Sequence, residues 1–179
     1  MFREEIEIRI DDVLLYQTLT STMARALKDR GSWFEQFKEF DKFFEKHKIK
    51  TILAILTDGI EQYPEWIEYI KKNKERYQIE IHGHKHMNYR NQSAEFGYNN
   101  LRNAKHAITE TFGIEPTTWY VPFAIRGYPD WGKEVCKELG LKFNKALDEN
   151  KKHYRCHYWN PRDVKRIKGI AKYYYGLEC

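Results

Sequence analysis

The chain has 179 residues, of which 41% are hydrophobic and 16% aromatic, and this length and composition fit one domain with a substantial core. Its formal net charge of +5 comes from 31 basic and 26 acidic side chains mixed along the sequence, whereas a dedicated nucleic-acid binder usually shows a clustered basic face. No apolar run approaches the roughly 20 residues of a membrane-spanning helix, the charged N-terminus does not resemble a secretory signal, and three cysteines without a CxxC pair indicate a reducing compartment. We therefore expect one domain over residues 1–179, cytoplasmic as written, without a nucleic-acid or membrane partner.

The first half of the chain alternates strand-like and helix-like segments. Residues 5–10 alternate polar and apolar side chains with the period of two that is typical of a strand. Phenylalanines at three- and four-residue steps predict an amphipathic helix over 23–48. The apolar run 51–56 predicts a strand covered on both faces, and proline in its first turn favours a helix over 64–75. Residues 77–82 alternate again and form the third predicted strand.

The second half continues the alternation. Apolar residues at helical steps predict a helix over 95–112, and a strand follows over 117–123. The remaining elements are a helix, a strand, a strand-like segment and a helix, over 129–140, 142–147, 154–160 and 161–176. Strand and helix thus alternate about six times, which predicts a mainly parallel sheet with helices outside, either open and doubly wound or closed into a barrel.

Chemically distinctive side chains follow the predicted strands, where ligands gather in both architectures. Aspartates follow the first and fifth strands, histidines follow the third and lie in or after the sixth, and a Pro-Phe pair ends the fourth. These residues are Asp11, Asp12, Asp148, His82, His84, His86, His157, Pro122 and Phe123.

The adjacent carboxylates Asp11 and Asp12 repel one another, and a divalent cation would offset that cost. The alternative is that one of them caps the next helix. His82 and His86 share one face if a helical turn follows the strand, whereas His84 joins them if the strand continues. Two imidazoles and one carboxylate with an open fourth position form a usual catalytic zinc sphere. The alternative is a polar, exposed strand end.

The segments "RIDDV", "EIHGHKH" and "WYVPF", in this order and spacing, resemble the polysaccharide deacetylase family, the NodB-homology carbohydrate esterases. The resemblance extends from about residue 5 to residue 160. It implies an irregular (β/α) barrel with fewer than eight repeats, and it makes residues 1–179 a single catalytic domain.

The resemblance also implies roles for individual residues. Asp11 matches the general base of the family. Asp12, His82 and His86 match its metal ligands, with zinc as the expected ion and cobalt, nickel or manganese as alternatives. His84 falls at the variable position and receives no ligand role.

Further matches concern the substrate and the general acid. Substrate contact is expected from Tyr120, Pro122 and Phe123, with an oxyanion donor in the backbone N–H there. The general acid matches His157 first and His153 second. Asp148 matches the carboxylate that orients this histidine, on strand order alone.

The sequence departs from the family pattern at two positions. Val13 replaces the usual glycine after the two aspartates. Tyr120 replaces the arginine that commonly holds the base, and Arg126 is a candidate substitute. The match of "CHYWN" to the motif of the general acid is loose.

The function implied is metal-dependent hydrolysis of N-acetyl groups on amino sugars of a chitin-like or peptidoglycan-like polymer or oligosaccharide. Three alternatives remain open. A small-molecule amidohydrolase would use the same site in a closed pocket instead of an open groove. A nucleic-acid-binding module would use the basic stretches 71–76 and 163–172, and a non-catalytic sugar-binding relative would fit the departures at Val13 and Tyr120.

Overall fold

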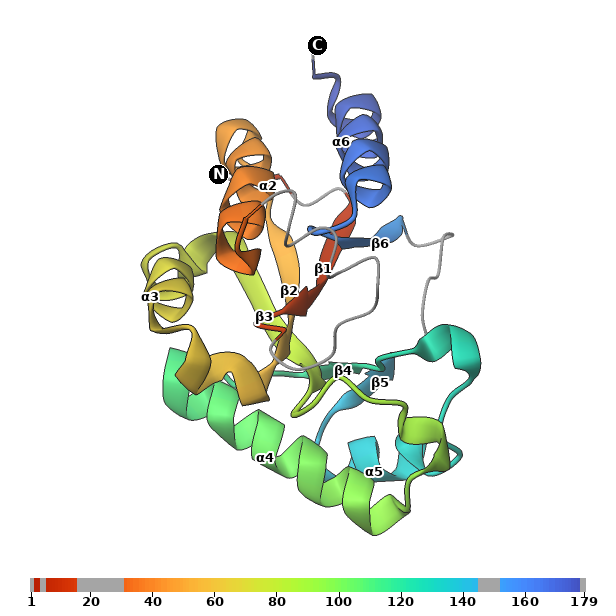
Figure 1. Ribbon diagram of the computed structural model, residues 1–179. Helices are drawn as coiled ribbons and strands as arrows, with labels where there is room; N and C mark the ends of the chain where they lie inside the picture. Colours follow the sequence, from red (N-terminus) through yellow and green to blue (C-terminus); the bar gives the residue numbers. More distant parts are fainter. Residues whose placement is uncertain (1, 4–5, 16–30, 145–151, 178–179) are drawn as a thin grey trace.

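The protein is described from a computed structural model that places residues 2–3, 6–15, 31–144 and 152–177 (Figure 1). Strands and helices alternate along these residues, as the sequence predicts. The strands are β1 (Glu7–Val13), β2 (Thr51–Leu56), β3 (Tyr77–Gly83), β4 (Thr118–Tyr120), β5 (Lys142–Asn144) and β6 (His153–His157). The α-helices are α2 (Trp33–His47), α3 (Pro64–Lys72), α4 (Ala94–Phe112), α5 (Gly132–Glu138) and α6 (Pro161–Tyr175).

All six strands join one parallel sheet in the order β5-β4-β3-β2-β1-β6. Strands β1 to β5 are neighbours in chain order, and β6 returns to pair with β1. Asp11 of β1 lies opposite His157 of β6 in this pairing. Because every strand runs in the same direction, the residues that follow the strands meet at one end of the sheet.

Contacts between strands that are not neighbours show that the sheet curls. The Tyr120 ring on β4 stacks on His153 of β6 with 5.8 Å between ring centroids. The guanidinium carbon of Arg9 on β1 lies 4.3 Å from the centroid of the same ring. The fold is therefore an irregular, partly closed (β/α) barrel of six strands, which confirms the predicted fold class.

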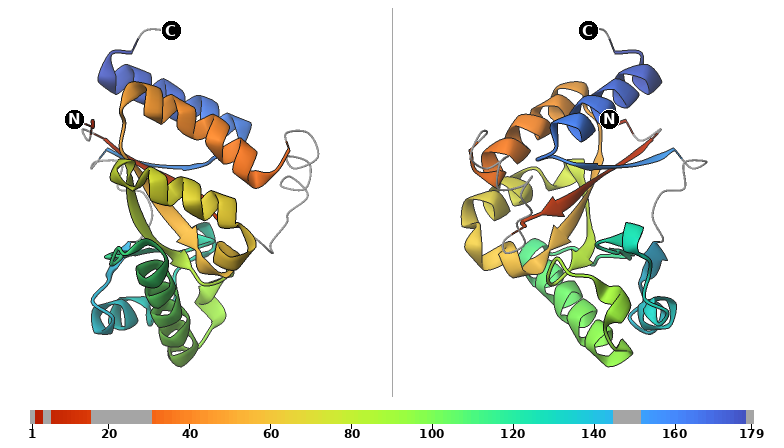
Figure 2. Two further views of the ribbon diagram at one scale, coloured as in Figure 1. Left: turned by 90° about the vertical axis from the view of Figure 1, so that its left-hand side faces the viewer. Right: turned by 45° about the vertical axis from the view of Figure 1, so that its right-hand side comes forward.

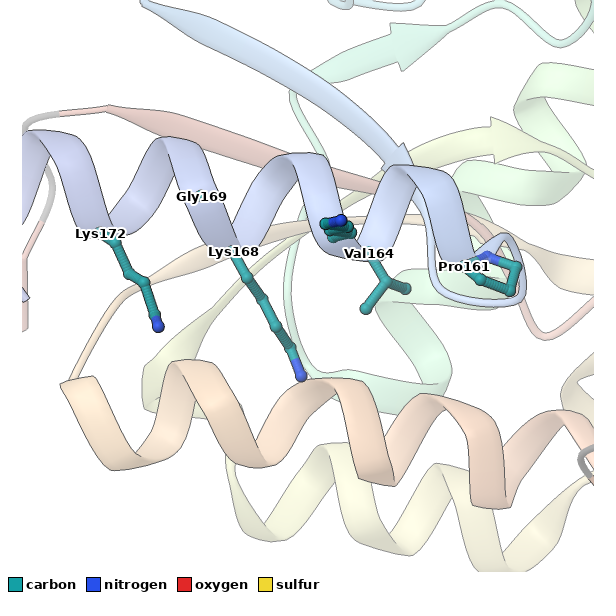
Figure 3. Close-up of a pocket in the computed structure, with 6 residues that line it drawn as sticks. Pro161, Val164, Lys168, Gly169 and Lys172 are labelled. Carbon is teal, nitrogen blue, oxygen red and sulfur yellow. The ribbon is translucent and has the colours of Figure 1, made fainter. Parts of the chain in front are cut away.

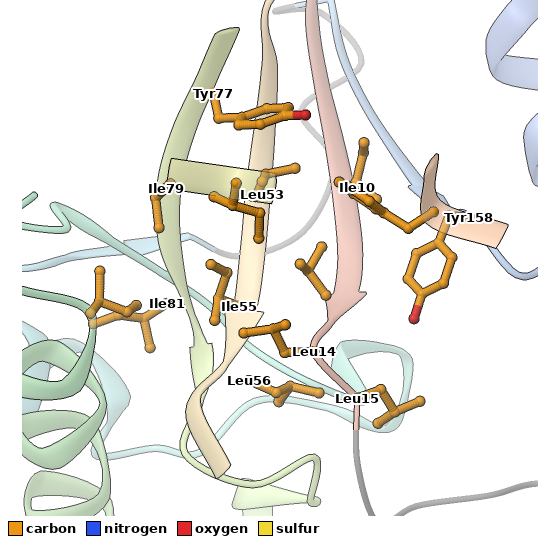
Figure 4. Close-up of a cluster of buried hydrophobic side chains, with 14 of the residues drawn as sticks. Ile10, Leu14, Leu15, Leu53, Ile55, Leu56, Tyr77, Ile79, Ile81 and Tyr158 are labelled. Carbon is orange, nitrogen blue, oxygen red and sulfur yellow. The ribbon is translucent and has the colours of Figure 1, made fainter. Parts of the chain in front are cut away.

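The two faces of each strand have different chemistry. Ile8 and Ile10 on β1, like Ile79 and Ile81 on β3, lie in the main hydrophobic core under the helices (Figure 4). The intervening residues of the same strands face the inside of the curled sheet and are largely polar; they include Glu7, Arg9, Asp11, Glu80 and His82. Because successive side chains of a strand point to opposite faces, the apolar side chains pack against the helices and the polar ones face the barrel interior.

The helices cover the outer face of the sheet. Phe37, Phe40 and Phe44 are the buried phenylalanines of α2, and Trp66 and Ile70 are buried on α3. Helices α2 and α6 lie side by side in both views of Figure 2. No helix in the described part of the chain combines the length and the apolar character that a membrane span requires.

Several element boundaries differ from the sequence prediction. Helix α2 begins at Trp33 because Ser32 caps it, with its hydroxyl accepting a hydrogen bond from the N–H of Glu35. The predicted start of this helix, over 23–30, lies outside the described residues. Strand β4 ends at Tyr120, since the chain reaches Pro122 and then a left-handed residue, Phe123 (φ 53°).

Two glycine substitutions test the packing of the helices. A Cβ at Gly97 on α4 would overlap the Trp131 ring, which is held by stacking on Trp119 at 5.8 Å. We expect Gly97→Ala to lower the free energy of unfolding by about 1–3 kcal/mol, the usual cost of overpacking. A Cβ at Gly169 on α6 meets nothing within 4 Å, so Gly169→Ala should raise the free energy of unfolding by about 0.5–1 kcal/mol. Urea denaturation measures both, and an unchanged stability of Gly97→Ala would contradict the packing described here.

Candidate metal centre

A backbone irregularity at the end of β1 separates the two adjacent aspartates. Asp12 has a left-handed conformation (φ 61°), and the register of β1 against β2 shifts between Ile10 and Val13. Without this bulge, the period of two would place Asp12 on the same face as Ile8 and Ile10, towards the helices. The turn instead brings Asp12 to the inner end of the barrel, beside Asp11, which faces inward by regular alternation, and each of the two residues is 2% exposed.

Asp12, His82 and His86 converge at this end. Their potential ligand atoms all lie within 4.8 Å of one another. Oδ1 of Asp12 is 3.3 Å from Nε2 of His82 and 3.1 Å from Nε2 of His86. His82 belongs to β3, and His86 lies in the bend that begins after Gly83, a left-handed residue (φ 148°). The three side chains singled out as metal ligands from the sequence are therefore brought together by two different strands.

His84 points away from this cluster. Its Nδ1 lies 3.0 Å from the hydroxyl of Thr57, and its backbone N–H donates to Oδ1 of Asn100. The segment after β3 is a bend and not the helical turn or extended strand that we considered from the sequence. The separation of His84 from the other two histidines agrees with its lack of a predicted ligand role.

The hydrogen bonds of His82 favour metal coordination. Nδ1 of His82 lies 2.6 Å from the carbonyl oxygen of Tyr120, which can only accept, so Nδ1 carries the proton. Nε2 is therefore the ring nitrogen that faces Asp12. Glu80, two residues earlier on the same face, accepts hydrogen bonds from the N–H groups of Thr117 and Thr118, which fixes β4 beside β3 and places the Tyr120 carbonyl.

The two oxygens of Asp12 have different environments. Oδ2 accepts a hydrogen bond of 3.0 Å from the indole N–H of Trp159. Oδ1 is buried and accepts no hydrogen bond from any residue that the structure describes. Burial raises the pKa of Asp12, but the neighbouring imidazoles of His82 and His86 outweigh it and hold the pKa well below its ordinary value. A buried, ionised oxygen that faces two imidazole nitrogens fits a divalent cation.

Asp11 is held by an arginine that the sequence analysis did not identify. Nε and Nη2 of Arg9 donate to Oδ1 and Oδ2 of Asp11 at 2.6 and 3.1 Å. Burial raises the pKa of Asp11, but the Arg9 guanidinium, together with the charges of His82 and His157, outweighs burial and keeps the pKa below its ordinary value. The proposed substitute, Arg126, is exposed, and its guanidinium lies over the Phe123 ring at 5.2 Å. The signal available in the sequence was the i, i+2 spacing of Arg9 and Asp11, which puts both on one face of the strand.

His157 reaches the centre from β6. Its Nε2 lies 3.9 Å from Oδ2 of Asp12, and its Nδ1 lies 2.7 Å from Oδ2 of Asp163. Burial lowers the pKa of His157, but the hydrogen bond to Asp163 and the charges of Asp12 and Asp11 together outweigh burial, and the pKa is raised. Asp148, the predicted partner of this histidine, lies outside the described residues. Asp163 was missed because it lies in the first turn of α6 and not at the end of a strand.

The other candidate acid, His153, lies deeper in the barrel. It pairs with Glu7 at the start of β1, and its Nδ1 is 2.8 Å from Oε2 of Glu7. Asp11, by contrast, pairs with His157. Of the two histidines, His157 is therefore the one beside the aspartates.

The predicted substrate contacts lie at different depths. Tyr120 is 3% exposed and its ring covers Arg9, so it lies beneath the centre and away from solvent. Pro122 is also buried. Phe123 is partly exposed, and its ring packs on the His86 imidazole with 4.4 Å between centroids. Phe123 is thus the member of this group that borders the candidate metal centre at the surface.

A separate groove of about 590 Å³ runs along α6, on the side that faces α2 (Figure 3). It is lined by Pro161, Val164, Lys165, Lys168, Gly169 and Lys172. None of these residues belongs to the cluster around Asp12, and we assign the groove no part in the metal centre.

Comparison with known proteins relates the chain to one family. The sequence profile described as "Polysaccharide deacetylase" matches residues 21–144. This range contains His82, His86 and the Tyr120–Phe123 segment, but it begins after Asp12 and ends before His157. A comparison with curated proteins finds no match.

Solved structures share the fold at low identity. A mutant with restored enzymatic activity, made from a CE4 family pseudoenzyme of Bacillus anthracis, matches with a TM-score of 0.71 and 9% identity over 96% of this chain. The chain spans only 63% of the length of that protein. The peptidoglycan deacetylase PdaC from Bacillus subtilis matches with a TM-score of 0.60 and 16% identity, over 94% of this chain and 81% of PdaC. The family 4 carbohydrate esterase from Streptomyces lividans, in complex with acetate, matches with a TM-score of 0.61 and 12% identity, over 96% of this chain and 88% of that one.

The metal centre predicts that zinc stabilises the folded protein. At a free Zn²⁺ concentration of about 100 times Kd, the free energy of unfolding should rise by about 2.7 kcal/mol. Asp12→Ala should abolish this effect, because it removes the oxygen between the two imidazoles. Asp130→Ala is the matched control, since Asp130 is exposed and the same substitution removes a carboxylate elsewhere. Thermal unfolding with and without zinc, together with metal analysis, checks both variants; negligible zinc in the wild type would contradict the centre.

Proposed function

The chain belongs to the polysaccharide deacetylase family, and from that premise we propose that it is a metal-dependent hydrolase that removes N-acetyl groups from amino sugars. The proposed substrate is a chitin-like or peptidoglycan-like polysaccharide or oligosaccharide. The observation that carries the proposal is the convergence of Asp12, His82 and His86 beside an arginine-held Asp11 and a carboxylate-held His157. On this proposal, the residues from β1 to α6 act as a single catalytic domain.

The donor set of two imidazoles and one carboxylate favours zinc, with cobalt, nickel or manganese as alternatives. When bound there, such an ion would polarise the acetamide carbonyl and lower the pKa of water. The tautomer of His82, set by the Tyr120 carbonyl, leaves Nε2 available as a ligand. The indole of Trp159 holds Oδ2 of Asp12, which directs Oδ1 towards the histidines.

Asp11 is the proposed general base. Its lowered pKa keeps it ionised at neutral pH, so that it can accept a proton from the attacking water. The new C–O bond forms at the acetamide carbon as this proton moves to Asp11. The N–H of Phe123 is the proposed donor to the developing oxyanion, since the preceding Pro122 has no N–H.

His157 is the proposed general acid. Its Nδ1 is engaged by Asp163, and its Nε2 faces Asp12, so the proton on Nε2 is the one directed towards the site. Transfer of this proton to the amide nitrogen allows the C–N bond to break. The products are acetate and a free amino sugar, and the Asp163 carboxylate stabilises the imidazolium before the transfer.

A non-catalytic sugar-binding role is the second candidate, because one structural relative is described as a pseudoenzyme. The two functions differ in one measurement. A non-catalytic relative would take up the metal and release no acetate from chito-oligosaccharides or peptidoglycan. The proposed enzyme releases acetate from at least one of them.

Substitution of the base separates catalysis from metal binding. Asp11→Asn keeps a side chain of similar shape that can no longer accept the proton. We expect the metal content to match that of the wild type and the rate of acetate release to fall by about 100-fold or more. Full activity in this variant would reject Asp11 as the base.

The partner of His157 can be identified by two matched variants. Asp163→Asn removes the carboxylate at 2.7 Å from Nδ1 of His157, and we expect kcat to fall by more than about tenfold with the metal retained. Asp148→Asn, at the position expected from strand order, should leave kcat within about twofold of the wild type. Acetate release at saturating substrate measures both variants. The opposite ranking would restore Asp148 as the orienting carboxylate.

A further inference from the structure

The adjacent carboxylates at the end of β1 are equally buried but have separate sets of partners. Asp11 and Asp12 are each 2% exposed. Either carboxylate could serve as a ligand by its chemistry, and His82 and His157 lie near enough to both to lower their pKa values. A mechanism that uses one carboxylate as base and the other as ligand therefore requires that the surroundings of Asp11 and Asp12 differ.

Arg9 occupies both oxygens of Asp11. Its Nε donates to Oδ1 and its Nη2 donates to Oδ2, a two-point contact that matches the fork of a guanidinium. The side chains of Arg9 and Asp11 are each 3% exposed, so water does not compete for this pair.

Arg9 is itself fixed by an aromatic ring. Its guanidinium carbon lies 4.3 Å from the centroid of Tyr120, whose ring is in turn stacked on His153. His153 is anchored by Glu7, two residues before Arg9 on the same face of β1. Three strands thus hold the guanidinium in the position that engages Asp11.

Asp12 has the complementary arrangement. The left-handed turn rotates it away from Arg9, and Trp159 takes only Oδ2. Oδ1 faces His82 and His86 and accepts no hydrogen bond among the described residues. One carboxylate is therefore fully engaged by protein donors, whereas the other keeps one oxygen for an ion.

We propose that Arg9, supported by Tyr120, is a positioning residue that keeps Asp11 off the metal ion and so assigns the role of base to Asp11 and that of ligand to Asp12. The inference rests on the proposed function. It gives Tyr120 a supporting role beneath the site in place of a contact with the sugar. Loss of Arg9 frees both oxygens of Asp11, which then binds the ion as an additional ligand and no longer accepts the proton.

Cobalt substitution tests this assignment without relying on turnover. We expect Arg9→Met to retain cobalt and to weaken its visible absorption, because an added oxygen ligand raises the coordination number. The double variant Arg9→Met/Asp11→Asn should regain the spectrum of the wild type. In the same preparations, kcat of Arg9→Met should fall by about 100-fold, as expected for a misplaced catalytic group.

Two further variants provide the controls. Arg9→Lys keeps the buried positive charge but not the two-point contact, so it should show a smaller spectral change in the same direction. Arg155→Met removes a second arginine near Asp11, whose Nε lies 3.9 Å from Oδ2, and should leave the cobalt spectrum unchanged.

The outcomes distinguish this inference from the proposed function. A cobalt spectrum that is the same in Arg9→Met and in the wild type would overturn the inference alone. A changed spectrum that Asp11→Asn does not reverse would also overturn it. Failure of both Arg9 variants to fold would assign Arg9 to stability and not to the division of roles. Absence of cobalt from the wild type would contradict the metal centre and the inference together.

Discussion

The centre depends on the left-handed turn of the backbone at Asp12. Regular alternation along β1 would direct this side chain into the hydrophobic core with Ile8 and Ile10. A bulge at this point redirects the side chain to the inner end of the barrel, where β3 supplies the histidines. Aspartate tolerates this conformation better than most residues, since its short polar side chain can bond locally. The side-chain contacts of the centre follow from this one departure from strand geometry.

The barrel interior supplies the polar groups that surround the site. Glu7, Arg9 and Asp11 of β1 face His153, Arg155 and His157 of β6 in register, so charged groups line the inside of the curled sheet. The apolar residues of the same strands pack outward against the helices. The hydrophobic core therefore lies between the sheet and the helices, and the interior is free to carry polar groups that support the site.

Much of this architecture could be predicted from the sequence, because it depends on patterns that are local. The alternation of strands and helices predicted the parallel sheet. The positions of Asp12, His82 and His86 after predicted strands made them candidate ligands. The partners of Asp11 and His157 were harder to find. Arg9 lies inside a strand and Asp163 lies in a helix, so neither stands where ligand-binding residues are expected. The roles of Arg9 and Asp163 can be recognised only when the pairing of β1 with β6 is known.

The two hydrogen bonds that residues after β6 make to Asp12 have a consequence for biosynthesis. Tyr158 donates to the backbone carbonyl of Asp12 and Trp159 to its carboxylate, across 146 and 147 positions of the sequence. The first strand must therefore leave the ribosome long before its partners are translated. Asp12 cannot acquire its final surroundings until Trp159 has been synthesised, so the centre matures after the strands β1 to β6 have been made.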